Sequence, residues 1–168
     1  MPTLRDATGV KPDAWTRVAA GQSVPAGARV ILPLDRLVEE GAPDGVKALG
    51  VHLGAAVDVR SLDGLLDALD LVSIEFASFA DGRGFSIARR LRAMGFAGEL
   101  RAAGPVIADQ FGALLAVGFD TVETPDALAA RQDPSQWQAA KEAVSAGYQS
   151  GYGQRSILEA RRAARRAA

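Results

Sequence analysis

The chain has 168 residues, 48% of them hydrophobic and 23% charged, and a formal net charge of −1. These values are typical of one globular domain and exclude a chain that is disordered throughout. Because the charge is nearly balanced, we expect no binding of nucleic acid. The sequence has no cysteine and one histidine, His52, which excludes disulfides, thiolate nucleophiles and the usual structural zinc sites. Composition leaves the identity of any cofactor open.

The first twenty residues are expected to form an arm rather than a leader or an anchor. Residues 1–6 lack the apolar core of a signal peptide, and no apolar stretch in the chain approaches the ~20 residues of a membrane-spanning helix. We therefore expect a cytoplasmic protein that does not bind membranes. Turn residues at 8–9 and 11–13 predict a short hairpin or an extended arm.

From residue 29 onward, short apolar runs alternate with segments that have helical spacing. The runs predict five strands, at 29–34, 50–54, 71–76, 98–103 and 119–123. The segments between and after them predict helices at 35–40, 61–69, 85–94, 105–117 and 134–146. This alternation indicates βαβ units. The expected fold class is α/β: a mainly parallel sheet of about five strands with covering helices, either open and doubly wound or a partial barrel.

The domain organisation is expected to be simple. No internal repeat and no linker divides the chain, so residues 1–153 are predicted to form a single α/β domain with an N-terminal arm. Residues 154–168 are predicted to form a basic helical tail, because arginines stand at 161, 162, 165 and 166. This tail is either a solvated terminal helix or a docking element for an acidic partner or a second copy of the chain.

The loop after the strand 71–76 holds the strongest candidates for a binding site, because ligands of parallel sheets bind beyond the carboxyl ends of the strands. It contains Asp81, Gly82, Arg83, Gly84 and Ser86. The glycines allow positive φ and let the backbone come close to another group, and the helix start offers free N–H groups. The side chains of Arg83 and Ser86 add hydrogen-bond donors. Together these features predict an anion cradle. The alternative is a tight turn in which Asp81 caps the helix or pairs with Arg83.

Three later polar residues are candidates for the same mouth of the sheet. Arg101 is expected either to reach the ligand or to pair with Glu75 or Glu99, because charges in a buried strand need partners. Asp109 and Gln110 either complement the dipole of the next helix or bind Arg101 or the ligand. The candidate ligand-binding residues are therefore Asp81, Gly82, Arg83, Gly84, Ser86, Arg101, Asp109 and Gln110. No metal ligands and no catalytic set are recognised.

Two further polar residues lie in apolar strands. Glu75 is predicted to be either an acid or base with a raised pKa or a salt-bridged structural residue. His52 is predicted to be a hydrogen-bonded core residue rather than a catalyst.

Several of these motifs together resemble a known bacterial family. The motifs are Phe79-Ala80-Asp81-Gly82-Arg83-Gly84-Phe85-Ser86, Arg89-Arg90-Leu91-Arg92, Glu99-Leu100-Arg101, Asp109-Gln110 and Gly118-Phe119-Asp120. They resemble the bacterial domain-of-unknown-function family 934, whose genes commonly lie beside those of sulfite and assimilatory sulfate reduction. Members are often labelled probable oxidoreductases of sulfite reduction. The family usually has an aspartate where this chain has Pro105, and a basic residue and a cysteine where it has Ala116-Val117.

Two functions therefore stay open at this point. The resemblance implies an accessory protein of sulfite reduction that binds an anion, or a partner such as a sulfite-reductase component, at the loop 81–86. The alternative is a small-molecule enzyme that acts on an oxyanion substrate with Arg83, Arg101 and Asp81. The residues supply no redox group, and Ile87 stands where the third glycine of a dinucleotide fingerprint belongs. An oxidoreductase role would need a bound flavin or siroheme, or a partner that carries one.

Overall fold

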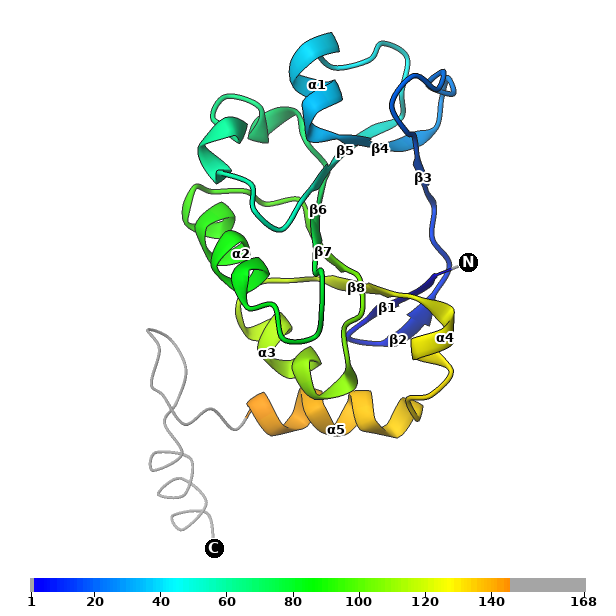
Figure 1. The fold of residues 1–168 in the computed structure, drawn as a ribbon, viewed down its shortest axis with the longest axis vertical. Helices are drawn as coiled ribbons and strands as arrows, with labels where there is room; N and C mark the ends of the chain where they lie inside the picture. The colour runs from blue at the N-terminus through cyan, green and yellow to red at the C-terminus, as the bar shows by residue number, and fades with distance from the viewer. Residues whose placement is uncertain (1, 146–168) are drawn as a thin grey trace, which may run out of the picture.

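In the part of the chain that the structure describes, eight strands form one sheet in the order β2-β1-β8-β7-β6-β5-β4-β3. The computed structural model describes residues 2–145 of the chain (Figure 1). The strands β3 to β8 run parallel to one another, whereas β1 is antiparallel to both β8 and β2. The strands are β1 (Thr3–Asp6), β2 (Gly9–Lys11), β3 (Trp15–Arg17), β4 (Arg29–Pro33), β5 (Ala48–Leu53), β6 (Leu71–Glu75), β7 (Glu99–Ala103) and β8 (Thr121–Thr124).

The mainly parallel α/β sheet and all five predicted strands are confirmed, but the sheet is larger than predicted. The additional strands β1, β2 and β3 come from the N-terminal arm. They have only three or four residues each and no apolar run, so local sequence does not mark them. The predicted hairpin forms one edge of the sheet, and β3 adds a parallel strand at the opposite edge.

The sheet is curled into a half-barrel, and the length of one connection explains why. Residues 12–14, which we call the strap, join β2 at one edge to β3 at the other. A flat sheet of eight strands would separate these edges by about 34 Å. The chain from Lys11 to Trp15 can span at most about 14 Å. The edges must therefore approach each other, and the strap crosses the open side of the curl (Figure 1, dark blue, on the right).

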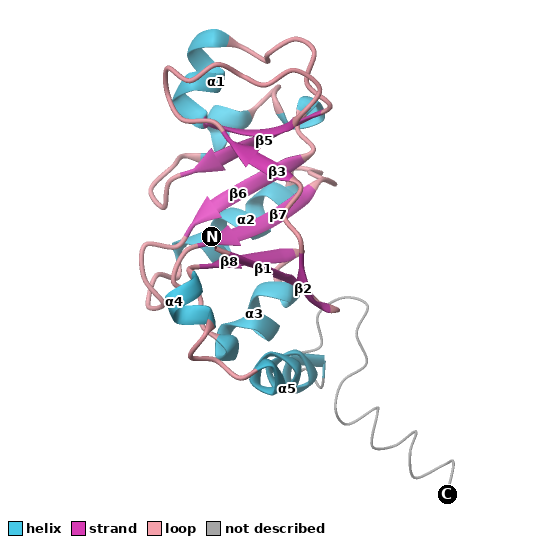
Figure 2. Ribbon diagram, turned by 90° about the vertical axis from the view of Figure 1, so that its right-hand side faces the viewer, coloured by secondary structure: helices cyan, strands magenta, loops and turns pink. Residues whose placement is uncertain are grey.

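Helices and turns cover the convex face of the curl. Alternate strand residues such as Val51, Ile74 and Leu100 point to that side and are fully buried in the hydrophobic core. Figures 1 and 2 show α2 and α3 packed on this side of the strands, with α5 beside α3. The helices are α1 (Leu34–Glu40), α2 (Arg83–Ala93), α3 (Phe111–Ala116), α4 (Asp126–Ala129) and α5 (Pro134–Ser145).

Two predicted helices are corrected by the structure. The helix predicted over 61–69 is two short 3-10 turns, η1 (Val59–Leu62) and η2 (Leu66–Ala68), because Gly64 between them takes a φ of 81°. The helix predicted over 105–117 begins later, as the 3-10 turn η3 (Ala108–Gln110) followed by α3. The predicted basic helical tail, 154–168, lies outside the described residues.

Candidate functional site

The loop after β6 is closed by an ion pair between Asp81 and Arg83. Asp81 Oδ1 accepts hydrogen bonds from the Arg83 backbone N at 3.0 Å and from Nε at 2.9 Å, and Oδ2 accepts one from Nη2 at 2.8 Å. These hydrogen bonds from Arg83 lower the pKa of Asp81 to about 2. The Arg83 side chain is 58% exposed. The structure thus shows the tight, self-paired turn, and an incoming anion must compete with the Asp81 carboxylate.

Neither glycine of this loop has a left-handed backbone, and only Gly84 is required by close packing. Gly82 has a φ of −85°, and Gly84, in the first turn of α2, has no positive φ either. A Cβ at Gly84 would lie closer to Cζ of Phe76 than real contacts allow. The predicted close approach is therefore confirmed at Gly84, while the positive φ predicted for the pair is wrong.

Gln110 joins the same loop from the side of η3. Its Nε2 donates to the carbonyl oxygen of Phe79 at 2.8 Å, and its Oε1 accepts from the backbone N of Ile107 at 3.1 Å. Ser86 and Asp109 are exposed. Of the eight predicted site residues, Asp81, Gly82, Arg83, Gly84 and Gln110 meet in this one braced loop.

Phe79 is a feature of the loop that the sequence argument did not single out. Its side chain is 63% exposed, although the loop backbone around it is held by hydrogen bonds. Phenylalanine is among the residues most often buried, so this exposed ring stands out on a loop whose backbone is hydrogen-bonded. The sequence pattern that could have indicated it is an aromatic residue in a polar, glycine-rich turn.

Arg101 lies elsewhere, on the concave face of the sheet, and is almost fully buried with 1% of its side chain exposed. Its Nη1 is 2.7 Å and its Nη2 3.2 Å from the two carboxylate oxygens of Asp13 in the strap. Glu99 accepts from Nη2 at 3.1 Å, and Glu123 lies 3.4 Å from Nη1. Of the two partners predicted for Arg101, Glu99 is confirmed and Glu75 is wrong. Its guanidinium therefore lies on the concave face and does not contribute to the loop 77–86.

The electrostatics of Arg101 follow from these three carboxylates. Burial lowers the pKa of the guanidinium, but the hydrogen bond with Asp13 and the charges of Glu99, Asp13 and Glu123 act in the opposite direction. The net effect raises the pKa of Arg101 above its ordinary value. The side chain is therefore a permanent buried cation whose charge is matched by the strap and two strands.

A second arginine extends this network across the interior of the curl. Arg17 Nη2 donates to Glu123 Oε2 at 2.6 Å and to Ser73 Oγ at 3.0 Å. Arg17 stands on β3 and Glu123 on β8, at positions that a flat sheet would hold about 24 Å apart. Their direct contact is possible because the sheet curls.

His52 ends this chain of hydrogen bonds. Its Nδ1 lies 3.1 Å from Ser73 Oγ. The Ser73 hydroxyl accepts from Arg17 and can either donate to Nδ1 or accept from it, so this contact joins His52 to the network in either tautomer. Burial and the charge of Arg17 lower the pKa of His52, although Glu75 and Glu123 oppose them. The predicted hydrogen bonding of His52 is confirmed.

Glu75 departs from the prediction. It is the last residue of β6, and its side chain is exposed rather than buried among apolar neighbours. The burial on which both interpretations of Glu75 depended is therefore wrong. The run Leu71–Glu75 is buried up to its fourth residue and ends at the surface.

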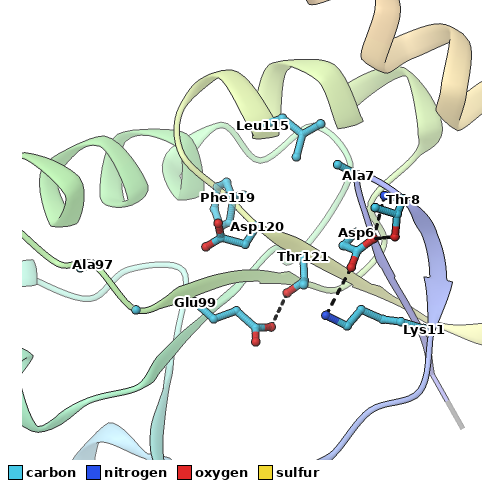
Figure 3. Close-up of a pocket in the computed structure, with 11 residues that line it drawn as sticks. Asp6, Ala7, Thr8, Lys11, Ala97, Glu99, Leu115, Phe119, Asp120 and Thr121 are labelled. Atoms are coloured by element: carbon cyan, nitrogen blue, oxygen red, sulfur yellow. Dashed lines mark hydrogen bonds and ion pairs between the residues drawn. The ribbon is translucent and has the colours of Figure 1, made fainter.

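One cavity opens at the amino end of β7 and β8 and has a volume of about 530 Å³ (Figure 3). In it, Glu99 accepts from Thr121 Oγ1 at 2.6 Å, and Lys11 Nζ lies 3.3 Å from Asp6. The hydrogen bond from the Thr8 side chain is the main cause that lowers the pKa of Asp6 to about 2. The carboxylates of Glu99 and Asp6 are therefore already paired with side chains that line the cavity.

A second cavity, of about 470 Å³, lies beneath the strap. Residues of β1, β2 and β3, of the strap and of the ion network on the concave face all contribute to its lining. The residues that line it include Leu4, Val10, Pro12, Asp13, Trp15, Arg17 and Glu123.

Other classes of site leave no trace in the described part of the chain. Within residues 2–145, no three histidine, aspartate or glutamate side chains are grouped to hold a metal ion. No helix in the same range has the length and apolar character needed to cross a membrane.

Comparison with known proteins gives one family. A sequence model described as "Bacterial protein of unknown function (DUF934)" matches residues 50–158, which is more than half of the chain. No curated protein matches the chain. The matched region includes the loop 77–86 and Arg101 but begins after β4, so the strap and Arg17 lie outside it.

Proposed function

Because the chain belongs to the bacterial family DUF934, whose function is unknown, we propose that it is an accessory protein that docks a partner protein through the loop 77–86. The proposed partner is a component of sulfite reduction, the context that the family resemblance implies. The observation that carries the proposal is Phe79, whose side chain is 63% exposed on a loop braced by Gln110.

The loop has the properties of a protein-binding anchor. Aromatic residues and arginine are enriched among the residues that dominate binding energy at interfaces, and here Phe79 and Arg83 are both exposed on one turn. The turn is held by Asp81 and Gln110, so little conformational entropy would be lost when a partner binds. An exposed aromatic ring on such a rigid turn supports docking of a complementary apolar pocket.

Binding of a free anion has weaker support. The Arg83 guanidinium already holds the Asp81 carboxylate with two of its nitrogen atoms. The alternative enzyme would use Arg83, Arg101 and Asp81, but Arg101 is engaged by Asp13, Glu99 and Glu123 on the concave face. Neither guanidinium is thus available to an oxyanion without the displacement of a carboxylate.

The test is a binding measurement with one matched control. Purified chain and purified sulfite-reductase subunits from the same bacterium are titrated by calorimetry. Phe79→Ala is expected to weaken binding at least tenfold, because a truncated anchor leaves its pocket unfilled. Val38→Ala on α1 removes a side chain that is similarly exposed (58%) and should leave the affinity unchanged.

Two outcomes contradict the proposal in different ways. Unchanged affinity in Phe79→Ala would exclude the loop as the docking site. A wild-type chain that binds none of the sulfite-reductase subunits would exclude this class of partner.

A further inference from the structure

The Asp13 side chain attaches the strap to the centre of the sheet. Its carboxylate binds Arg101 as the carboxylate of a bound ligand would. Asp13 reaches from the exposed strap to Arg101, and its two oxygens face Nη1 and Nη2 at 2.7 and 3.2 Å. This is the two-pronged geometry in which guanidinium groups bind free carboxylates. The side chain of Asp13 is 30% exposed, whereas that of Arg101 is 1% exposed. A carboxylate from solvent could therefore reach the position that Asp13 occupies.

The space next to this carboxylate suits a small organic molecule. The cavity beneath the strap measures about 470 Å³, which falls in the range of small-molecule sites. Its apolar lining residues include Leu4, Val10, Pro12 and Trp15. Asp13 itself is part of the wall, so the apolar space and the Arg101 fork meet at this residue.

We propose that this cavity binds a small carboxylic acid with an apolar body, whose carboxylate replaces that of Asp13 on Arg101. The apolar body would lie against Trp15 and Leu4. The strap would move outward with Asp13, since residues 12–14 are exposed. This proposal concerns a site on the concave face and does not depend on docking through the loop 77–86.

The charges of the network select a monoanion. Arg17 and Arg101 carry two positive charges, and Asp13, Glu99 and Glu123 carry three negative ones. When Asp13 is withdrawn the sum of these charges rises from −1 to zero, and one bound carboxylate returns it to −1. Lys11 also lines the cavity, but its charge is paired with Asp6. A phosphate dianion would add a further negative charge beside two glutamates, which is unfavourable in a buried site. A planar monocarboxylate fits both the fork and the charge.

The decisive experiment measures binding of benzoate to the full chain and to Asp13→Asn by calorimetry. The variant keeps the size of the residue and an oxygen that can accept from the Trp15 backbone N, as Asp13 does at 3.1 Å. It removes the competing charge, so benzoate should bind Asp13→Asn at least tenfold more tightly than wild type. Benzamide, the neutral analogue, and inorganic phosphate should bind neither protein. The matched variant Asp44→Asn, at an exposed aspartate, should behave as wild type.

Fluorescence locates the bound benzoate independently. Benzoate should change the emission of the full chain through Trp15, because Trp137 is buried at 3% exposure beneath the Arg5 side chain, away from the cavity. Trp15→Phe should abolish that change. In the Asp13→Asn background, Arg101→Lys keeps the charge but removes the fork and should weaken benzoate binding at least tenfold.

Several results would overturn the proposal. Equal benzoate affinity in wild type and Asp13→Asn would show that Asp13 does not occupy the site. Benzamide binding as tight as benzoate would exclude a role for the carboxylate. A benzoate-induced fluorescence change that persists in Trp15→Phe would show that benzoate binds elsewhere. This result does not depend on whether the Arg101→Lys variant folds.

Discussion

Two of the aspartate–arginine pairs within residues 2–145 have the same chemistry and opposite surroundings. Asp81 and Arg83 are two residues apart and form one turn, with bonds of 2.8 and 2.9 Å between the side chains. Asp13 and Arg101 are 88 residues apart and join the strap to the middle of the sheet at 2.7 and 3.2 Å. The Arg83 side chain is 58% exposed and that of Arg101 1%.

The difference indicates that burial, and not hydrogen-bond geometry, decides how much an aspartate–arginine pair contributes to the stability of the fold. Water solvates Arg83 whether or not Asp81 is present, so that pair shapes a turn and adds little to global stability. Arg101 has no access to water, so its charge must be balanced by side chains at all times. One consequence is that the buried pair ties the N-terminal arm to the sheet, whereas the exposed pair prepares a surface.

The largest effect should come from removal of the buried cation. Arg101→Met leaves Glu99, Glu123 and Asp13 close together without their common partner, and it should lower the free energy of unfolding by about 3–5 kcal/mol. Urea denaturation measures the loss. The matched variant Arg89→Met, at an exposed position on α2, should change stability by less than about 0.5 kcal/mol. Equal losses in the two variants would contradict the comparison.

Removal of the strap carboxylate should have a smaller effect. Asp13→Ala deletes two hydrogen bonds to a charged group, but Arg101 keeps Glu99 and Glu123. We expect a loss of about 1.5–3 kcal/mol by urea denaturation. Asp44→Ala serves as the control, because Asp44 is an exposed aspartate in a loop. A loss as large as that of Arg101→Met would mean that the strap alone holds the network together.

The sequence predicts the parts of the fold that local patterns encode. Aliphatic runs such as Leu71–Glu75 mark the five central strands, since strands buried in a parallel sheet are continuously apolar. The strand Trp15–Arg17 has no such run and is a strand because its backbone pairs with the edge of β4. Gly64 has the opposite effect, since its positive φ interrupts a segment whose leucine spacing predicts a helix.

The candidate site divides in the same way. Pairing of Asp81 with Arg83 follows from a spacing of two residues in a turn, so the sequence contains that alternative. The partner of Arg101 on the strap is not predictable, because Asp13 meets it only when the two edges of the sheet approach. Glu99, two residues before Arg101 on the same face of the strand, was predictable from the alternation of side chains.

Near neutral pH, the free energy of unfolding should depend on His52 in the network of the concave face and not on the loop 77–86. The pKa of His52 in the folded protein lies below its ordinary value of 6.5, so the unfolded chain binds the proton more readily. The free energy of unfolding contributed by His52 is therefore fully present above pH 6.5 and decreases as the pH falls towards the folded pKa. His52→Gln should flatten the stability profile below pH 6.5 in urea titrations. A slope unchanged by this substitution would contradict the assignment of a neutral His52.

The smallest effect on stability should come from the exposed pair of Asp81 and Arg83. Loss of this pair should instead change the pKa of Asp81. The pKa of Asp81 is about 2, against an ordinary value of 3.8, because Arg83 donates hydrogen bonds to the carboxylate. The contribution of this pair is present above pH 3.8 and disappears only as the pH falls through about 2. Arg83→Gln should return the Asp81 pKa towards 3.8 in carboxyl NMR titrations, while Arg89→Gln leaves it near 2. At pH 7 both variants should melt at the wild-type temperature, because exposed pairs contribute little. A lower melting temperature in Arg83→Gln alone would show that the turn stabilises the whole fold, and the contrast between the two pairs would then fail.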